Sequence, residues 1–495
     1  MHYAIIAAGQ GERLRSEGVM RPKPLVRVAG ESLLRRLVSI FMRNDADEIA
    51  VICNEDYTEV ADALKDIQEN GINGKSVPLR FIVKTTPGSM HSFHHLSSIL
   101  SPGPFIMTTV DTIFQEEEFA DYVQSFTKAI EKGTADALMG VSSYIDDEKP
   151  LYVRMGNDHG INAFLDHQED ALHVSAGIYG LTDRCRDVLS DCISSGKLRM
   201  REYQRALLTS GLTVKAYTFG KVLDIDHSSD IAKAESMLGA RTLLIQRAKR
   251  FSPGAVEKDM SLLSTIAAHL NKEGKDTEIV SEEDTERLCS LLGGKEKVSA
   301  IVSMARSEEA LGLIGKYVSM HPETPIVNLP DAVRGCHKGR IDRLMQSSGI
   351  PVPPSEGSNE YWLKRGDGWT ESPEDIIRVN SPKDIDTARK RLEARGALDI
   401  IVQSHVEGTV VKFYGVKGSG FFQAYTNGMP YTESETVRDI RVHAEKISNQ
   451  SGVSVYGGDC IVDSESNLYF IDFNDFPSFS PCRDEAVSAI ISILQ

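Results

Sequence analysis

Hydrophobic runs of strand length alternate with amphipathic stretches over the first half of the chain. The strand-length runs cover residues 3–8, 48–53, 79–84 and 105–110. Between them, stretches such as 33–42 and 57–69 carry apolar residues at helical spacing. This strand–helix–strand order predicts an α/β unit, in which helices cover both faces of a parallel sheet. Ligands of such sheets bind beyond the carboxyl ends of the strands.

A break in this pattern is expected near residue 250. A helical pattern over residues 230–250 is expected to close the first unit, and the turn-forming segment 251–254 follows it. We therefore place a first domain at residues 1–238, a linker at 239–254 and a second domain at 255–495.

The second half begins with a similar alternation and ends in strands that look antiparallel. The predicted helices cover 262–270, 308–318, 338–345 and 484–494. The predicted strands cover 298–304, 326–329, 361–364, 400–404, 409–414, 454–462 and 468–473. A proline-rich connection at 350–354 stops the preceding helix, and residues 463–467 are expected to form a hairpin turn. These elements predict an α+β domain.

Composition excludes several classes of protein. The 495 residues carry a formal net charge of −16 and no long basic block, so nucleic acid is not expected as a main partner, although a local basic pocket for a nucleotide is compatible. No apolar run reaches the length of a membrane span. The N-terminus lacks the features of a secretory signal, and the seven cysteines are scattered without CxxC spacing. We therefore expect a cytoplasmic protein. The sequence does not indicate its oligomeric state.

The strongest chemical signal directly follows the first predicted strand, at residues 7–14. Gly9 and Gly11 allow a sharp turn and bring backbone N–H groups close to phosphate oxygens. Arg13 and Lys23 add two cations, which would stabilise the charge that builds up as pyrophosphate leaves a triphosphate. A glycine turn with surface charge would explain the two glycines alone. The strand and the two cations together favour a nucleotide site.

Two aspartates follow strand-like segments and are candidate metal ligands. Asp111 ends the run 105–110, and Asp226 lies in 222–227 together with Asp224. Residues two apart leave the same face of a strand, so Asp224 would neighbour Asp226. Magnesium prefers oxygen ligands and needs only one or two carboxylates when phosphates supply the rest. An aspartate at the end of a strand is also a common cap or turn residue.

With these motifs, residues 1–238 resemble the Rossmann-like nucleotidyltransferases, which join a nucleoside triphosphate to a sugar phosphate or alcohol phosphate and release pyrophosphate. The resemblance implies a Rossmann-like domain with a mixed, mostly parallel sheet, Arg13 and Lys23 as catalytic cations, and Asp111 and Asp226 as Mg²⁺ ligands. Many relatives carry glycine where Val110 stands here. The implied nucleotide-binding residues are Ala8, Gly9, Gly11, Arg13, Lys23 and Ser89.

Base and acceptor recognition follow from the same resemblance. Ser89 is either a contact to the base and ribose or the N-cap of the next helix. Lys149 and Gly177 fall in the part that relatives use for the acceptor, and Lys149 is either a ligand of the acceptor phosphate or a solvated loop lysine. No general base is needed, because an acceptor phosphate oxygen is already anionic at neutral pH.

A second group of oxygen ligands lies near the C-terminus. Asp472 lies in the run 468–473, and Asn474 follows this run directly. The two residues are two apart, so both side chains leave the same face of a strand. If the run 454–462 pairs with it, Asp459 can join them around Mg²⁺ and the phosphates of ATP. A polar strand face exposed to water would also explain the alternation.

Residues 255–495 resemble the ATP-grasp family on this basis. The resemblance implies Asp459, Asp472 and Asn474 as metal ligands and Lys364 as a ligand of the ATP phosphates. The segment 403–408 would meet adenine and ribose through Gln403 and Glu407, and Lys338 and Lys412 are either further phosphate contacts or solvated lysines. The loop 365–369, which would cover the phosphates, is short and contains few glycines.

The two resemblances together imply a bifunctional enzyme. The C-terminal kinase would phosphorylate a small alcohol or polyol, and the N-terminal domain would transfer a nucleotidyl group to that phosphate; CTP and inositol are expected by family analogy alone. An alternative is a nucleotidyltransferase fused to an ATP-grasp carboxylate–amine ligase of cell-surface polysaccharide or phosphonate biosynthesis. A nucleotide-binding regulator with decayed sites is a third.

Overall fold

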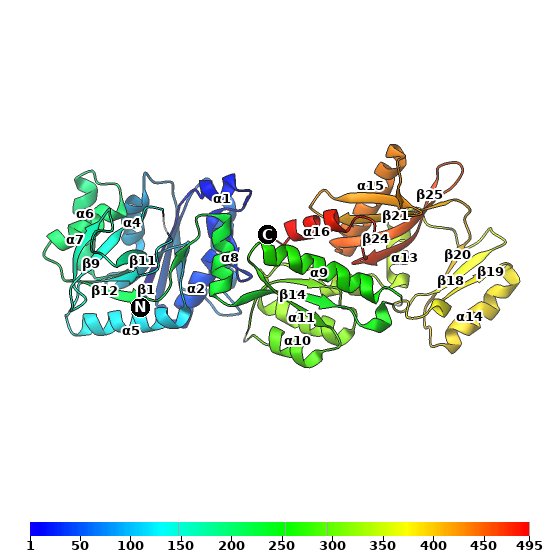
Figure 1. Cartoon of the computed structure of the whole chain (residues 1–495), viewed down its shortest axis with the longest axis horizontal. Coiled ribbons are helices and arrows are strands. Elements are labelled where there is room, and N and C mark those ends of the chain that lie inside the picture. Colours follow the sequence, from blue (N-terminus) through cyan, green and yellow to red (C-terminus); the bar gives the residue numbers. More distant parts are fainter. Residues whose placement is uncertain (147, 253, 295, 495) are drawn as a thin grey trace. The chain divides into compact units, whose positions relative to one another are not determined.

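The chain folds into two compact units, Met1–Leu238 and Gly239–Gln495. The computed structural model, drawn in Figure 1, describes residues 1–494 apart from 147, 253 and 295. No helix among these residues is long and apolar enough to cross a bilayer.

The first unit is built on a nine-stranded mixed sheet. Its main path runs β10-β9-β11-β6-β1-β4-β5, and β8 pairs with both β11 and β12. The strands are β1 His2–Ala7, β4 Glu48–Cys53, β5 Leu79–Val83, β6 Phe105–Thr109, β8 Ala137–Ser142, β9 Tyr152–Met155, β10 Ile161–Leu165, β11 His173–Leu181 and β12 Val214–Phe219. Strands β6, β1, β4 and β5 are parallel, as expected, whereas β11 runs antiparallel to β6, β8 and β9.

Helices cover both faces of this sheet, and β1 shows why. Its side chains alternate between two buried cores: Tyr3, Ile5 and Ala7 face one, and Ala4 and Ile6 face the other. The first core receives α2 Leu33–Arg43, α3 Thr58–Asn70, α5 Glu116–Glu131 and α8 Ser228–Met237. The second receives α4 Ser89–Ile99, α6 Asp183–Ser194 and α7 Met200–Thr209. A strand buried on both faces requires the continuous apolar run seen in the sequence.

Short elements at the carboxyl ends of the strands bring distant residues together. They are α1 Glu12–Ser16, β2 Arg27–Val28, β3 Glu31–Ser32, β7 Thr112–Ile113 and β13 Leu223–Asp224. Strand β7 pairs antiparallel with β13, and the Ile225 amide donates to the Asp111 carbonyl at 3.1 Å. This ladder holds the segment after β6 against the segment that precedes α8.

The predicted helix over 230–250 and the predicted linker over 239–254 are both wrong. Helix α8 ends at Met237, Gly239 takes a left-handed conformation with φ of 67°, and Ala240–Gln246 forms strand β14. Leu243 and Ile245 pack into one core and Leu244 into another. Three consecutive apolar residues suit a strand buried on both faces better than one face of a helix. Position 253 of the expected break lies outside the described residues.

Strand β14 instead lies inside the parallel sheet that opens the second unit. The order is β15-β14-β16-β17, with β15 Asp276–Ser281, β16 Lys297–Ser303 and β17 Ile326–Val327. Its helices are α9 Val256–Lys272, α10 Thr285–Leu292, α11 Glu308–Met320, α12 Pro330–Gly335 and α13 Lys338–Ser347.

Two antiparallel sheets complete the second unit (Figure 1). The first has the order β19-β18-β20, with β18 Tyr361–Arg365, β19 Ile376–Val379 and β20 Ile400–Ser404. The second has the order β23-β22-β21-β24-β25, with β21 Thr409–Val416, β22 Phe422–Thr426, β23 Met429–Pro430, β24 Val455–Val462 and β25 Leu468–Asp475. The remaining helices are α14 Ile385–Ala394, α15 Ser434–Ser451 and α16 Arg483–Ser492. The described part of this unit is therefore α+β.

Candidate functional sites

A cavity of about 690 Å³ opens at the carboxyl ends of β1 and β6 in the first unit. All of the nucleotide and metal candidates predicted for this unit line it, namely Ala8, Gly9, Gly11, Arg13, Lys23, Ser89, Asp111 and Asp226. The cavity has the size of a typical small-molecule site and lies where α/β sheets bind their ligands.

The glycine loop brings its backbone against the short helical turn Lys23–Leu25. Gly11 has a φ of 63°, and a Cβ added there would lie 3.1 Å from the Cβ of Lys23. Glycine is therefore needed at position 11 both for the left-handed backbone and for the approach of Lys23.

We expect Gly11→Ala to lower kcat/KM for pyrophosphate release by at least about 10-fold, because the added methyl group displaces Lys23. Gly133→Ala is the matched control, since Gly133 has the same φ of 63° and nothing within 4 Å of an added Cβ. Steady-state kinetics on both variants would separate the effect of the contact with Lys23 from the effect of a strained backbone. Equal losses in the two variants would show that displacement of Lys23 is not the cause.

Lys23 lies between the two predicted metal ligands. Its Nζ is 2.5 Å from Asp111 Oδ2 and 2.7 Å from Asp226 Oδ1, and its side chain is only 10% exposed. Burial opposes the charge on Lys23, but the two carboxylates raise its pKa above the ordinary value. Burial likewise acts to raise the pKa of Asp111, and Lys23 outweighs it, so the net pKa of Asp111 lies below its usual range. Lys23 and Asp111 are therefore charged at neutral pH.

The same geometry fits a magnesium ion. The two carboxylates converge on a single cation, Lys23 Nζ, and supply only hard oxygen donors. No group of three or more His, Cys, Asp or Glu side chains suited to a metal occurs among the described residues. A site with two carboxylates therefore needs phosphate oxygens to complete the coordination of Mg²⁺, which is the pattern typical of nucleotide sites.

Hydroxyl and amide groups line the other end of this cavity. Asn54 Oδ1 accepts from Thr85 Oγ1 at 2.8 Å, and the hydroxyls of Thr86 and Ser92 are 2.6 Å apart. Ser89 is the first residue of α4, whose N-cap is Gly88. The structure therefore does not support the N-cap interpretation of Ser89, and its role as a base or ribose contact stays a prediction.

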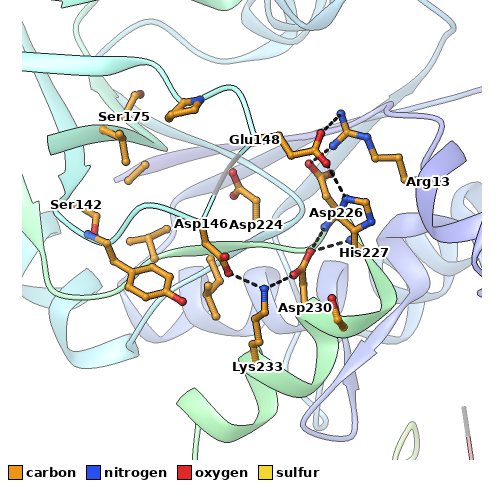
Figure 2. Close-up of a pocket in the computed structure, with 17 residues that line it drawn as sticks. Arg13, Ser142, Asp146, Glu148, Ser175, Asp224, Asp226, His227, Asp230 and Lys233 are labelled. Carbon is orange, nitrogen blue, oxygen red and sulfur yellow. Dashed lines mark hydrogen bonds and ion pairs between the residues drawn. The ribbon is translucent and has the colours of Figure 1, made fainter. Parts of the chain in front are cut away.

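A second, smaller pocket of about 140 Å³ adjoins the first. The two share Arg13 and Asp226 in their walls. Figure 2 shows its lining side chains, with Lys233 between Asp146 and Asp230. Lys233 Nζ lies 2.8 Å from Asp146 Oδ2 and 3.1 Å from Asp230 Oδ1.

Glu17 joins the glycine-loop side of the site to the start of α8. Its carboxylate lies 2.6 Å from His227 Nδ1 and accepts from the amide and hydroxyl of Ser228 at 2.7 and 2.8 Å. A second carboxylate, that of Asp230, also lies at the start of α8, and its Oδ2 accepts from the amides of Asp226 and His227. The segment that carries Asp226 is thus fixed by two carboxylates.

We expect His227 to titrate above its ordinary pKa of 6.5, because Glu17 stabilises the charged ring, and the same contacts lower the pKa of Glu17 to about 2. A raised pKa contributes stability below about 6.5 that is lost as the pH rises through the folded value. The lowered pKa of Glu17 contributes stability above about 4.5 that is lost as the pH falls toward 2. The Glu17–His227 pair therefore contributes most to the stability of the folded state between about pH 4.5 and pH 6.5.

A pH titration of the His227 ring followed by proton NMR in the presence of EDTA would test this, with Glu17→Gln as the variant. The titration midpoint of His227 should move down toward pH 6.5 in the variant. An unchanged midpoint would show that Glu17 does not stabilise the charged ring.

The two acceptor candidates lie beside the smaller pocket without lining it. The lining includes Glu148 and Pro150 but not Lys149, which is exposed and whose carbonyl accepts from Arg201 at 3.2 Å. Gly177 lies on β11 with a φ of 70°, and a Cβ there would meet Thr112 Oγ1 at 3.0 Å. The pocket's basic side chains are Arg13, His227 and Lys233, and the role of Lys149 as a ligand of the acceptor phosphate stays a prediction. Sequence reasoning also missed Glu17, Asp146 and Asp230.

In the second unit, the three predicted metal ligands lie together on β24 and β25. Asp459 and Asp472 are opposite each other in the antiparallel ladder, and Asn474 Nδ2 donates to Asp472 Oδ2 at 2.7 Å. The side chains of Asp459 and Asp472 are 27% and 23% exposed. This is a partly buried oxygen cluster rather than a fully solvated strand face, and its donor set fits Mg²⁺.

Three lysines surround this cluster. Lys338 Nζ lies 3.0 Å from Asp472, Lys412 Nζ lies 2.9 Å from Asp459, and Lys364 donates to Gln403 Oε1 and the Ile471 carbonyl at 2.8 and 2.9 Å. Lys338 is thus paired and largely buried, whereas Lys412 is paired but 57% exposed. Asp342 also acts on Lys364, so three lysines face three carboxylates, Asp342, Asp459 and Asp472, in and around this cluster.

The pKa values of this cluster diverge. Burial acts to raise the pKa of Asp472, but Lys338 and Lys364 outweigh it and lower the value to about 2. Burial and the facing Asp472 raise the pKa of Asp459. Burial lowers the pKa of Lys364. Divergent pKa values among neighbouring groups are typical of functional sites.

Of the two predicted adenine contacts, only Gln403 is joined to the cluster. Gln403 Nε2 donates to Asp342 Oδ1 at 2.8 Å, and burial raises the pKa of Asp342. Asp342 on α13 was not identified from the sequence. Glu407 is exposed in the segment between β20 and β21, and no hydrogen bond or ion pair between described residues ties it to the lysines.

Comparisons with known proteins concern the first unit. Residues 3–173 match the sequence profile of the MobA-like NTP transferase domain. The first unit therefore carries a nucleotidyltransferase domain of this type.

Two curated relatives match about half of the chain. A "Bifunctional IPC transferase and DIPP synthase" of Rubrobacter xylanophilus is 26% identical over 242 residues, which cover 48% of this chain and 51% of the relative. A "Bifunctional protein GlmU" of Methanococcus maripaludis is 23% identical over 243 residues, covering 48% and 54%. The chain thus spans about half the length of the curated relatives it matches.

Among solved structures, the inositol-1-phosphate CTP transferase of T. maritima is similar over 48% of this chain and 94% of its own, with 20% identity and a TM-score of 0.40.

Proposed function

We propose that the first unit transfers a nucleotidyl group from a nucleoside triphosphate to the phosphate of a small phosphorylated alcohol and releases pyrophosphate. The observation that carries this proposal is Lys23 held between Asp111 and Asp226 in a cavity whose mouth also presents Arg13 and the glycine loop. Arg13 and Lys23 would neutralise the leaving pyrophosphate, and the loop amides would bind its oxygens. Bound Mg²⁺, held by Asp111 and Asp226, would supply further charge neutralisation.

CTP and inositol phosphate are the first substrates to test. The names of two relatives, an IPC transferase and an inositol-1-phosphate CTP transferase, support this choice. The pair of adjoining pockets also supports an acceptor distinct from the nucleotide, since Arg13 and Asp226 stand in both walls.

For the second unit, we propose an ATP-grasp kinase that phosphorylates the same alcohol. The proposal is supported by the cluster of Asp459, Asp472 and Asn474 with three lysines around it. A nucleotidyltransferase needs a phosphorylated acceptor, and a kinase in the same chain would supply it at high local concentration.

The test uses the full chain in two assays. Pyrophosphate release is measured with each of the four triphosphates, Mg²⁺ and a panel of phosphorylated alcohols. ADP formation is measured with ATP, Mg²⁺ and the parent alcohols. We expect one triphosphate and one class of acceptor to release pyrophosphate, and the matching alcohol to release ADP.

Two outcomes would contradict these proposals. If no triphosphate yields pyrophosphate with any acceptor, the first unit is not a nucleotidyltransferase for phosphorylated alcohols. If ADP appears only when a carboxylate and an amine are both present, the second unit is a ligase and not a kinase.

A further inference from the structure

The cluster on β24 and β25 has three lysines and three carboxylates in and around it. Two of the lysines pair directly with a carboxylate: Lys338 Nζ lies 3.0 Å from Asp472 Oδ1, and Lys412 Nζ lies 2.9 Å from Asp459 Oδ1. The third lysine is Lys364. Three closed ion pairs would leave little charge for the phosphates of a nucleotide, so the pairing of Lys364 determines what the cluster can bind.

Lys364 differs from the other two lysines because both of its hydrogen bonds go to neutral oxygens. Its Nζ donates to the side-chain Oε1 of Gln403 at 2.8 Å and to the backbone carbonyl of Ile471 at 2.9 Å. An ammonium group has three N–H donors. Within the described part of the chain these contacts use two of them, and the third is left for a ligand. Burial lowers the pKa of Lys364, as expected for a charge that water compensates poorly.

The third carboxylate, that of Asp342, is held one side chain away from Lys364. Asp342 lies on α13 and Gln403 on β20, and both side chains are buried. Gln403 Nε2 donates to Asp342 Oδ1 at 2.8 Å, while Oε1 of the same amide accepts from Lys364. A neutral amide therefore stands between this carboxylate and the ammonium group.

Asp342 also determines which way the Gln403 amide points. The two ends of an amide have nearly the same shape, so its hydrogen-bond partners fix its orientation. Turned over, the Gln403 amide would place its oxygen against the Asp342 carboxylate and its NH₂ group against the Lys364 ammonium, and neither contact could form a hydrogen bond. The second oxygen of Asp342, Oδ2, accepts from Gln346 Nε2 at 2.6 Å. Both oxygens of Asp342 thus act as acceptors, which is the environment that this orientation of Gln403 requires.

We propose that Asp342 and Gln403 are positioning residues of the ATP site. Gln403 is a neutral spacer, oriented by Asp342, that fixes Lys364 without neutralising it, so the ammonium charge remains available to the phosphates of ATP. This inference rests on the proposed ATP site of the second unit. It gives Gln403 a role that does not depend on contact with adenine.

The test exchanges the two functional groups between positions 342 and 403. In the double variant Asp342→Asn, Gln403→Glu, here called the exchanged variant, the carboxylate moves to position 403 and the amide moves to position 342. Every hydrogen bond can still form, because the carboxylate at 403 accepts from Lys364 and from the amide at 342, whose oxygen accepts from Gln346. The amino-acid composition of the pair and the net charge barely differ from the native chain, but Lys364 now pairs directly with a carboxylate.

The affinity for ATP is measured by titration calorimetry on the full chain with Mg²⁺. All proteins, the reference included, carry Lys23→Ala to weaken nucleotide binding by the first unit. Asp472→Asn in this background identifies the binding event of the second unit. We expect the exchanged variant to bind ATP at least about 10-fold more weakly than the reference, since a hydrogen bond to a charged group contributes about that factor. A thermal melt checks that the exchanged variant is folded.

Asp342→Asn alone separates the spacing of the charges from the charge itself. Its amide oxygen can still accept from Gln403, and Gln346 is exposed and can turn its own amide, so the spacer keeps its orientation. This variant should bind ATP at least as tightly as the reference, because no carboxylate has moved toward Lys364. Asp386→Asn, at an exposed position of α14, is the matched control and should equal the reference.

Tripolyphosphate, which has no base, separates an effect through Lys364 from an effect on adenine. Its affinity is measured with the same proteins. The exchanged variant should lose affinity for tripolyphosphate by about the same factor as for ATP, because the loss arises at the phosphates.

The outcomes distinguish this inference from the proposed function. If a folded exchanged variant binds ATP as tightly as the reference, or if Asp342→Asn alone weakens binding as much as the exchange, the spacer role of Gln403 is wrong while the ATP site stands. If ATP binding is weakened and tripolyphosphate binding is not, Gln403 acts on the base instead. If no binding of ATP depends on Asp472, the proposed ATP site fails, and this inference fails with it. Should the exchanged variant not fold, Gln403→Glu alone carries the same expectation, because it also places a carboxylate on Lys364.

Discussion

Replacing Lys23 with alanine is expected to lower the rate of pyrophosphate release by about 10³-fold. Lys23 is the buried cation that joins Asp111 and Asp226, so its loss removes the charge that would stabilise the leaving pyrophosphate. It also leaves two carboxylates facing each other without a partner between them, which weakens triphosphate binding. The measurement is pyrophosphate release by the full chain with saturating triphosphate and acceptor.

Three comparisons make this result specific. Lys132→Ala removes an exposed lysine at the end of α5 and should have no effect. Lys23→Arg keeps the charge and should recover part of the rate. ADP formation from ATP should persist in Lys23→Ala, and a thermal melt would show that the first unit is still folded. Near-normal pyrophosphate release by a folded Lys23→Ala protein would exclude Lys23 from the reaction.

Asp472→Asn is expected to have the opposite effect, lowering ATP consumption by about 10³-fold while pyrophosphate release from a supplied acceptor phosphate continues. Lys338 and Lys364 hold the pKa of Asp472 at about 2, so the carboxylate is ionised at every working pH. The substitution keeps the shape of the side chain and removes the charge that would hold Mg²⁺ and order Lys338. The measurement is ADP formation with ATP, Mg²⁺ and the alcohol.

Asp386→Asn, at an exposed position in α14, is the control for this change. Loss of both activities in a folded Asp472→Asn protein would mean that the two sites do not work independently. Persistence of ADP formation would remove Asp472 from the ATP site.

Site residues whose position follows from local chain geometry could be predicted from the sequence. The glycine loop and Arg13 follow a buried strand directly, and Asp111 stands at the end of another, so their meeting at one edge of the sheet follows from parallel pairing. Asp472 and Asn474 were accessible for the same kind of reason, because the two-residue period of a strand puts them on one face. Their catalytic roles stay predictions.

Residues that act through distant contacts left no local signal. Glu17 meets His227 and Ser228 across about two hundred residues of sequence, and Lys233 becomes a pocket residue only because α8 lies beside the loop that carries Asp146. Lys149 has the right charge in the right segment, but the pocket is lined by its neighbours. Which lysine reaches a pocket depends on tertiary packing that one-dimensional patterns do not contain.

The position of strand β14 constrains where the two compact units can be separated or exchanged. A fragment that starts at residue 255 loses the strand that pairs with both β15 and β16, and with it the residues that join two hydrophobic cores. Gene fusions, domain swaps and truncations should therefore break the chain between Leu238 and Gly239. A cut only sixteen residues later, where the sequence alone suggests a break, would leave the second half without the central strand of its parallel sheet.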